Sequence, residues 1–166
     1  MSELVRFEKR GAIGVITVDN PPVNALSPGV PEGMAECVAK GNADPDIKAM
    51  VLIGQGGKFI AGADIKQMGK GNTTPTEWRE TVEMSEKPVV AAIQGYALGG
   101  GLETAMLCNY RIASETAKIG QPEVAIGIIP GAGGTQRVPR LAGVQAALDM
   151  IVGGEHYPSS AGKNLG

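Results

Sequence analysis

Residues 88–107 read PVVAAIQGYALGGGLETAML, and this stretch decides the fold class. The apolar and β-branched residues 89–93 predict a buried strand, because such side chains pack well on a pleated sheet. The glycines at 99–101 predict a sharp turn, and residues 102–107 have the composition and the apolar stripe of a helix. A strand, a glycine turn and a helix in succession are typical of α/β proteins.

The rest of the chain repeats this alternation on both sides. Aliphatic and β-branched runs predict further strands at residues 12–18, 47–54 and 109–114. Helical spacing predicts helices at residues 31–40, 64–68, 76–86 and 135–141, and the pattern is completed by an apolar run at 124–129 and by residues 144–152. We therefore predict an α/β fold and, because no linker or regular repeat interrupts it, one domain over residues 1–166.

Glycine supplies 25 of the 166 residues, about twice its usual share. These glycines stand in clusters between aliphatic runs, which excludes a collagen repeat. A hydrophobic content of 43% is enough for a core, so disorder is excluded as well. We interpret the glycine clusters as sharp turns within a folded protein.

Charge and aromatic content argue against nucleic-acid and membrane partners. Fifteen Lys and Arg residues and seventeen Asp and Glu residues give a net charge of −2, with no block of one sign. Aromatic residues, which would stack on bases, make up only 4%. The first residues lack the pattern of a signal peptide, and no apolar run approaches the roughly 20 residues of a membrane span. We expect a cytoplasmic protein that binds neither nucleic acid nor membrane.

The cysteines and the histidine offer little chemistry. Cys37 and Cys108 form no CxxC motif, which fits a reducing compartment and argues against a zinc site or a disulfide. We expect both to be buried packing residues, and we expect no bound metal. His156 is the only histidine, so a mechanism with a histidine base would depend on that residue alone.

Glycine turns ahead of helices first suggest phosphate binding, but both standard loops are absent. Neither Lys58 nor Lys163, which each follow a glycine, is followed by the Ser or Thr of a P-loop. The dinucleotide fingerprint GxGxxG would require glycine at Thr104 and at Gln136. Nucleotide binding by a standard loop is therefore not expected.

A different use of the turn at residues 99–101 is more attractive. Glycine lets a backbone approach a ligand closely, and a helix N-terminus has N–H groups without partners in the helix. Two such donors aimed at one carbonyl oxygen form an oxyanion hole, and the second could come from AGAD at residues 61–64. The alternative is that both stretches are tight packing turns, and the spacing alone leaves both open.

Glu103 and Glu123 are the candidate acid–base residues. Glu103 falls in the first turn of the expected helix, where the helix dipole favours the ionised carboxylate of a base. Glu123 precedes an apolar run, so partial burial would raise its pKa and suit a proton donor. The alternative is a solvated first-turn acid and a loop residue in a salt bridge.

Four stretches of the chain resemble the crotonase, or enoyl-CoA hydratase/isomerase, superfamily. They are NPPVNAL at residues 20–26, FIAGADIK at 59–66, GYALGGGLE at 95–103, and QPE at 121–123 with IPGAGGTQR at 129–137. The motifs come in the family's order and spread over nearly the whole chain. With the preceding aspartate, the first of them resembles the N-terminal hydratase/isomerase part of multifunctional fatty-acid β-oxidation proteins.

The resemblance implies a crotonase-like core of repeated ββα units with Glu103 and Glu123 as the two catalytic carboxylates. It implies that the backbone N–H groups of Ala63 and Gly100 form an oxyanion hole for a coenzyme A thioester. The residues that it places along the substrate are Asn24, Ala25, Leu26, Ala61, Asp64, Ile65, Lys66 and Gly131.

The activity that the resemblance implies is hydration of a trans-2-enoyl-CoA, in which one glutamate activates water at C3 and the other supplies a proton at C2. Members that only shift a double bond need the glutamate corresponding to Glu123, so the presence of both favours a hydratase. Double-bond isomerisation, thioester hydrolysis and a non-catalytic acyl-CoA-binding fragment are the alternatives. Coenzyme A is part of the substrate, so the resemblance implies no cofactor and no metal.

Family members continue past residue 166, and residues 153–166 resemble the segment just before their C-terminal helices. The resemblance therefore predicts a core that lacks the C-terminal helical region. Because those helices join subunits in the family, it also implies a homo-oligomer, a trimer or a dimer of trimers, for the full-length chain.

Overall fold

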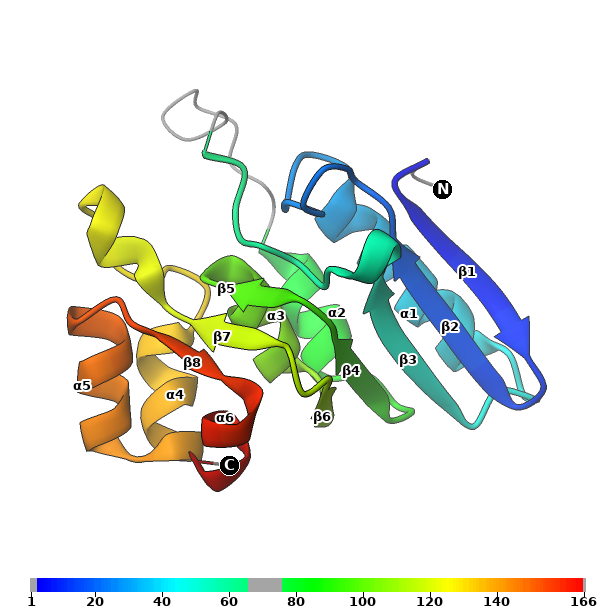
Figure 1. Ribbon diagram of the computed structural model, residues 1–166. Coiled ribbons are helices and arrows are strands. Elements are labelled where there is room, and N and C mark those ends of the chain that lie inside the picture. Colours follow the sequence, from blue (N-terminus) through cyan, green and yellow to red (C-terminus); the bar gives the residue numbers. More distant parts are fainter. Residues whose placement is uncertain (1–2, 66–75, 166) are drawn as a thin grey trace.

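The strands of the computed structural model, which describes residues 3–65 and 76–165, form a larger and a smaller β-sheet (Figure 1). The larger sheet has the order β1 (Val5–Arg10), β2 (Ile13–Val18), β3 (Ala49–Gly54), β4 (Val89–Ile93) and β6 (Tyr110–Ala113). β1 is antiparallel to β2, and the other neighbours run parallel. The smaller sheet has the order β5 (Tyr96–Leu98), β7 (Lys118–Gly120) and β8 (His156–Pro158).

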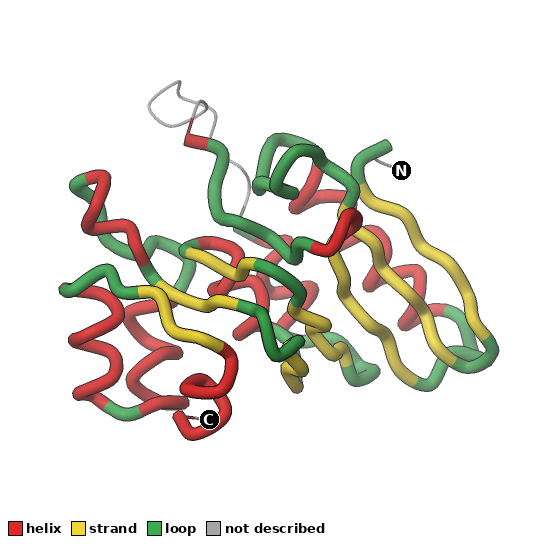
Figure 2. Tube along the Cα trace, in the orientation of Figure 1, coloured by secondary structure: helices red, strands yellow, loops and turns green. Residues whose placement is uncertain are grey.

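Helices alternate with these strands, as the colouring of Figure 2 shows. α1 (Val30–Ala43), α2 (Glu77–Glu83) and α3 (Gly100–Leu107) lie along one face of the larger sheet (Figure 1). α4 (Gly134–Ala142), α5 (Val144–Val152) and α6 (Ser159–Leu165) follow at the other end of the molecule, and short 3-10 helices cover Gln55–Gly57 and Pro122–Ile126. The predicted α/β fold is therefore confirmed.

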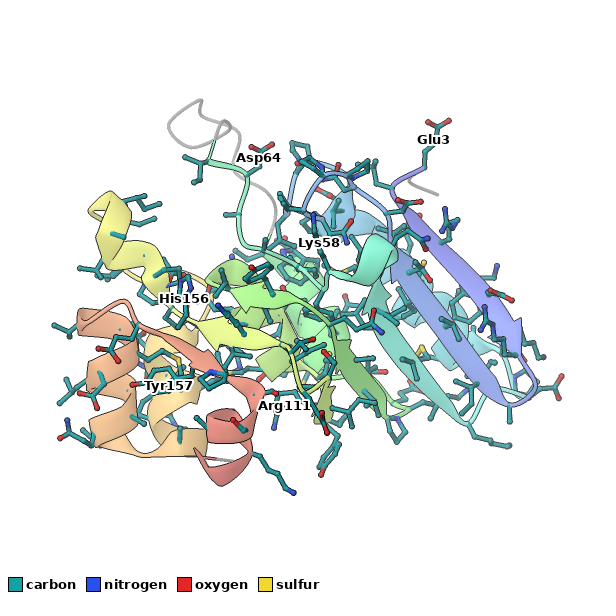
Figure 3. The ribbon with its side chains drawn as sticks, viewed as in Figure 1. Glu3, Lys58, Asp64, Arg111, His156 and Tyr157 are labelled. Carbon is teal, nitrogen blue, oxygen red and sulfur yellow. The ribbon has the colours of Figure 1, made fainter. Side chains whose placement is uncertain are left out.

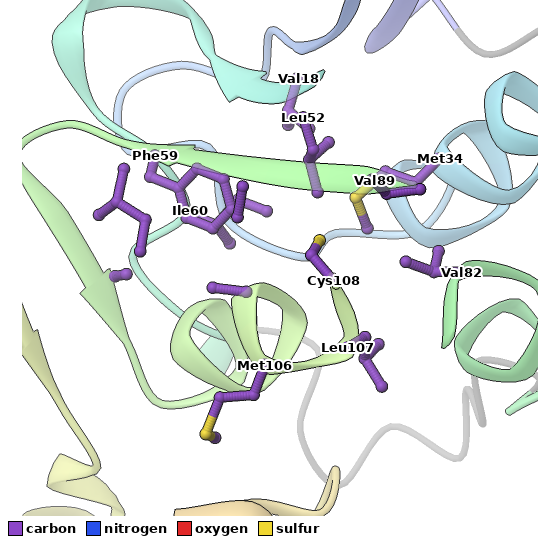
Figure 4. Close-up of a cluster of buried hydrophobic side chains, with 14 of the residues drawn as sticks. Val18, Met34, Leu52, Phe59, Ile60, Val82, Val89, Met106, Leu107 and Cys108 are labelled. Carbon is purple, nitrogen blue, oxygen red and sulfur yellow. The ribbon is translucent and has the colours of Figure 1, made fainter. Parts of the chain in front are cut away.

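The hydrophobic core lies between the larger sheet and its helices. Met34 of α1, Val82 of α2 and Leu107 of α3 all contribute to the buried cluster that Figure 4 shows beside β4. Phe59 and Ile60, from the segment after β3, are fully buried in it. The single tryptophan, Trp78 of α2, is 6% exposed. Burial of these large apolar side chains is the main favourable term that holds the helices to the sheet.

The carboxyl ends of the parallel strands position the site described below. Val15, Val51 and Val90 lie in register across β2, β3 and β4, so these strands end at one edge of the sheet. At this edge β3 is followed by the segment that includes residues 59–65, and β4 is followed by β5 and α3. Crevices at such edges are where α/β proteins bind ligands.

Several expected elements differ in extent from the structure. The helix expected at 76–86 ends at Glu83, because the chain then turns back against α1, where the Ser85 hydroxyl and the Lys87 N–H both donate to Asn42 Oδ1. The apolar run at 124–129 forms no buried element: the 3-10 helix ends at Ile126, and Ile129 is 74% exposed. The helix expected at 64–68 falls mostly outside the described residues.

Some elements have no counterpart in the sequence-based prediction. β1 reads VRFEKR and lies at the edge of the sheet, where its mostly exposed polar residues hide the signal of a strand. β5, β7 and β8 have three residues each, too few for a hydrophobic period, and α6 was not predicted either. No helix in the described parts of the chain is long and apolar enough to span a membrane.

Candidate active site

The two glutamates singled out in the sequence meet at the start of α3. Glu103 lies in the first turn of that helix and is 3% exposed, and Glu123 lies in the 3-10 helix Pro122–Ile126 and is 9% exposed. A β-carbon at Gly99 would lie 2.9 Å from Oε1 of Glu123, so a glycine directly before α3 makes room for that carboxylate. The two side chains are close enough for the Glu103 charge to raise the pKa of Glu123.

The Glu103 carboxylate is held by the backbone of the loop before α4. Its Oε1 accepts hydrogen bonds from the N–H of Ala132 at 2.7 Å and from the N–H of Gly134 at 2.8 Å. Gly134 is the first residue of α4, where backbone N–H groups have no partner within the helix. The buried carboxylate thus sits in the first turn of α3 and at the start of α4, and both helix ends favour a negative charge.

Glu123 is in a less favourable environment for its charge. The pKa of this carboxyl is raised from 4.5 to about 6, mainly by burial; a backbone hydrogen bond within the turn opposes the rise, and the Glu103 charge contributes to it. Burial disfavours the ionised form because the protein solvates it less well than water does. The raised pKa of Glu123 therefore agrees with the expectation from its partial burial.

Gln121 is a residue of the site that the sequence analysis did not single out. It is completely buried two positions before Glu123. With its amide nitrogen turned toward Glu123, it donates to Oε1 at 3.0 Å and to Oε2 at 3.1 Å, and this orientation of the amide follows from the hydrogen-bond network. In the sequence Gln121 is only a polar residue between β7 and a proline, and its burial becomes visible only in the fold.

The backbone around Gly100 and Ala63 brings two N–H groups to the same region. A β-carbon at Gly100 would lie 3.5 Å from the backbone nitrogen of Ala63 and 3.0 Å from Cδ1 of Leu26. Ala63 and Leu26 pair as an isolated parallel bridge, and the Leu26 N–H donates to the Gly62 carbonyl at 2.9 Å. Gly100 is the first residue of α3, so its N–H has no partner within the helix.

The three consecutive glycines before and in α3 serve different purposes. Gly99 has φ 51° and ψ −124°, a conformation that residues with a side chain avoid. A β-carbon at Gly101 would lie 1.8 Å from the carbonyl oxygen of Ile60, so this glycine allows α3 to pack directly on a neighbouring backbone. Gly101 therefore makes the tight packing contact of one alternative, and the oxyanion hole stays a prediction.

Several residues expected along the substrate lie where the loop after β2 contacts the segment after β3. Asn24 is buried, with its Nδ2 donating to the carbonyls of Gln55 at 3.0 Å and Lys58 at 2.8 Å, so its side chain ties loops together. Asp64 accepts a hydrogen bond from the Ser27 hydroxyl at 2.9 Å. Figure 3 shows Asp64 and Lys58 on the upper side of the molecule, away from Arg111 and Tyr157.

The remaining expected positions differ in their surroundings. Ala25 and Leu26 follow Asn24, and the Ala61 N–H donates to the Val23 carbonyl at 3.2 Å. Ile65 is 62% exposed, Gly131 has open space around its α-carbon, and Lys66 lies outside the described residues.

Neither the cysteines nor the histidine belongs to the candidate site. Cys37 and Cys108 are buried, as expected, and burial raises their pKa to about 11 and about 12. Their thiols therefore stay protonated near neutral pH and are poor nucleophiles. His156 lies exposed on β8, opposite Gly120 of β7.

Comparisons with known proteins show the family to which this chain belongs. The profile of the Enoyl-CoA hydratase/isomerase family matches residues 8–166. The chain is 44% identical over 166 residues to a peroxisomal bifunctional enzyme of Danio rerio, covering 98% of this chain and 23% of the relative. It is 43% identical over 163 residues to a probable enoyl-CoA hydratase of Bacillus subtilis, covering 93% of this chain and 63% of the relative.

Solved structures give the same result. The crystal structure of an enoyl-CoA hydratase from Bacillus anthracis matches with a TM-score of 0.89 and 33% identity, covering 99% of this chain and 68% of that one. The fold is thus the crotonase fold, and the chain belongs to the enoyl-CoA hydratase/isomerase family. It spans about a quarter of the bifunctional relative's length and about two thirds of the single hydratases.

Proposed function

We propose that this chain is the core of an enoyl-CoA hydratase that adds water to a trans-2-enoyl-CoA in fatty-acid β-oxidation. The observation that carries the proposal is the pairing of two buried carboxyls with different environments. Glu103 accepts two backbone N–H groups, whereas burial raises the pKa of Glu123 to about 6. Two such groups supply a base and an acid without a histidine.

Glu103 is proposed as the base. Both backbone donors bind its Oε1, which leaves Oε2 for a water molecule. As the water oxygen bonds to C3 of the substrate, its proton passes to Glu103, and the electrons of the double bond move toward the thioester oxygen.

Glu123 is proposed as the proton donor at C2. With a pKa of about 6, about one molecule in ten carries this proton at pH 7. Transfer of the proton to C2 completes the 3-hydroxyacyl thioester. Exchange with solvent then returns a proton to Glu123 and removes the one on Glu103.

The N–H groups of Ala63 and Gly100 are proposed to hold the thioester oxygen. Negative charge develops on that oxygen during addition, and each donor placed there lowers the barrier by about 3 kcal/mol. The neighbourhood of Ala63 and the first residue of α3 supports this role. The coenzyme A part is proposed to lie along Asn24, Ala25, Leu26, Ala61, Asp64, Ile65 and Lys66, with Gly131 lining the site, and the reaction is proposed to need no further cofactor or metal.

Domain organisation, assembly and location are proposals as well. We propose one domain over residues 1–166 and a homo-oligomer, a trimer or a dimer of trimers, for the full-length protein. The proposed location is the cytoplasm, although several relatives are named peroxisomal. Neither nucleic acid nor a membrane is a proposed partner.

The test follows the loss of the conjugated thioester absorbance when the chain is mixed with a short trans-2-enoyl-CoA. We expect Glu103→Gln and Glu123→Gln each to reduce the rate at least about a hundredfold. Glu80→Gln, on the exposed side of α2, serves as the control and retains the full rate. Unchanged rates in both site variants would overturn the assignment.

Two further measurements separate the alternatives. If the wild type shifts a double bond without hydrating a trans-2-enoyl-CoA, and Glu103→Gln keeps that activity, the chain is an isomerase that uses Glu123 alone. Calorimetry with a non-hydrolysable acyl-CoA detects binding without turnover, which would identify a non-catalytic acyl-CoA-binding fragment. Absence of binding argues against both an enzyme and a binding fragment.

A further inference from the structure

An arginine side chain outside the candidate site contacts the loop that binds the Glu103 carboxylate. Arg137 lies on α4 with its side chain 22% exposed. Its Nη1 donates to the carbonyl oxygen of Ala132 at 3.1 Å, and Ala132 is one of the two residues whose N–H groups bind the Glu103 carboxylate.

The three peptide groups of this loop alternate in direction. The N–H of Ala132 and the N–H of Gly134 point to Glu103, and the peptide between them presents its carbonyl to Arg137. Backbone N–H groups that converge in this way form an anion-binding concavity. A change in the ψ angle of Ala132 or the φ angle of Gly133 alone would turn one flanking N–H relative to the other, and the hydrogen bond from Arg137 to the middle peptide opposes such a change.

The guanidinium itself is held from the opposite side. Its Nε donates to Oε1 of Glu83 at 3.1 Å and its Nη2 donates to Oε2 at 2.6 Å. Such a two-point pair fixes the plane of an arginine as well as its position. Glu83 is the last residue of α2, so the pair connects α2 to the loop before α4.

Gly133 provides the space that this arrangement needs. It has φ +101°, and a β-carbon there would lie 1.9 Å from Nη1 of Arg137. The loop therefore passes close to the guanidinium. A glycine is needed at this position because a side chain would collide with Arg137.

We propose that Arg137 is a positioning residue for the Glu103 carboxylate, held in place by Glu83 and acting through the Ala132 peptide. The kinetic part of this inference rests on the proposed hydratase function. The structural part concerns only the loop at residues 131–134, and it is measured independently of turnover.

The first experiment measures amide hydrogen exchange at Ala132 and Gly134 by NMR. We expect Arg137→Gln and Glu83→Gln each to speed exchange at both amides about tenfold, while amides of β2 and β3 keep their rates. Arg140→Gln is the matched control, since Arg140 lies on the same helix and donates to Gln136 within it. Unchanged exchange at Ala132 and Gly134 in Arg137→Gln overturns the inference.

Exchanging the two charges distinguishes positioning from a simple link between helices. The double variant Glu83→Arg with Arg137→Glu restores an ion pair between α2 and α4, but a glutamate at 137 has no N–H for the Ala132 carbonyl. We expect the urea midpoint to recover while exchange at Ala132 and Gly134 stays fast. Recovery of slow exchange would show that only the link between helices matters.

Hydration kinetics provide the second readout. We expect kcat to fall about tenfold in Arg137→Gln and in the double variant with KM within twofold, and Arg140→Gln to keep the wild-type values. If the wild-type chain does not hydrate an enoyl-CoA, the proposed function fails, and the amide exchange still decides the role of Arg137. If the wild type is active and Arg137→Gln keeps its kcat, the positioning role is wrong.

Discussion

The α-carbon of Gly99 lies against the carboxylate of Glu123, so that a β-carbon on Gly99 would stand 2.9 Å from Oε1. Gly99→Ala is therefore expected to displace this carboxylate and to force an alanine into φ 51° and ψ −124°. We expect a loss of about 3 kcal/mol in the free energy of unfolding, measured in urea.

Gly11→Ala is the matched control for that variant. Gly11 also has positive φ, at +60°, but nothing lies within 4 Å of an added β-carbon. This variant should lose only about 1 kcal/mol, the cost of the left-handed conformation. Equal losses at the two positions would show that the contact with Glu123 has no energetic weight.

Glu123→Gln is expected to change stability in a pH-dependent way. The folded protein raises the pKa of this carboxyl from 4.5 to about 6, so the folded state binds the proton more tightly than the unfolded state does. Its contribution to stability is present below pH 4.5 and is lost as the pH rises through 6. Relative to wild type, Glu123→Gln should therefore become more stable by about 2 kcal/mol between pH 4 and pH 7.

Urea unfolding of both proteins at several pH values measures this difference. Glu80→Gln, an exposed carboxyl of α2, shows the background from removing one charge. A difference between wild type and Glu123→Gln that stays constant with pH would contradict the raised pKa.

Gly134→Ala is expected to disturb the site of Glu103. An added β-carbon would lie 2.8 Å from the side-chain amide of Gln121, 2.9 Å from Cβ of Pro130 and 3.0 Å from Oε1 of Glu103. We expect a loss of about 2 kcal/mol in the free energy of unfolding, because three neighbours have to move. In Gly131→Ala, where nothing lies within 4 Å, the change should stay within about 0.5 kcal/mol, and a similar loss in both would contradict the crowding.

Asn24→Asp is expected to loosen the loops that border the site. The Nδ2 of Asn24 donates to the carbonyls of Gln55 and Lys58, and an aspartate would place a charged acceptor against both oxygens. We expect a loss of about 3 kcal/mol at pH 7 in urea unfolding. Asn109→Asp should cost within about 0.5 kcal/mol, because Asn109 uses its Oδ1 to accept from the Val89 N–H. Comparable losses would contradict this assignment of donors.

The sequence predicted the parts of the fold that depend on long apolar patterns. The strands β2, β3, β4 and β6 and the helices α1, α3 and α4 lie within a few residues of their expected bounds. The edge strand β1 and the three-residue strands escaped prediction, because their pairing is decided by neighbours that are distant in the chain. The turn at residues 124–129 was misleading, since its aliphatic side chains are largely exposed in the structure.

The two carboxyl groups of the candidate site could be predicted from the sequence, but the residues that hold them in place could not. Glu103 and Glu123 could be singled out from their positions beside a glycine turn and an apolar run. Their partners could not: Ala132 and Gly134 lie 29 and 31 positions beyond Glu103, and only the packing of α4 against α3 brings them together. The same holds for Arg137, whose partner Glu83 lies 54 positions earlier in the chain.

The burial of Trp78 in α2 supplies the protein with an optical probe. As the single tryptophan of the chain, it dominates the intrinsic fluorescence, and its emission shifts to longer wavelength when α2 leaves the core. Glu83, which holds Arg137, closes the same helix one and a half turns later. Detachment of α2, which carries the Glu83 partner of Arg137, can therefore be followed in one spectrum, without a label or an added reporter.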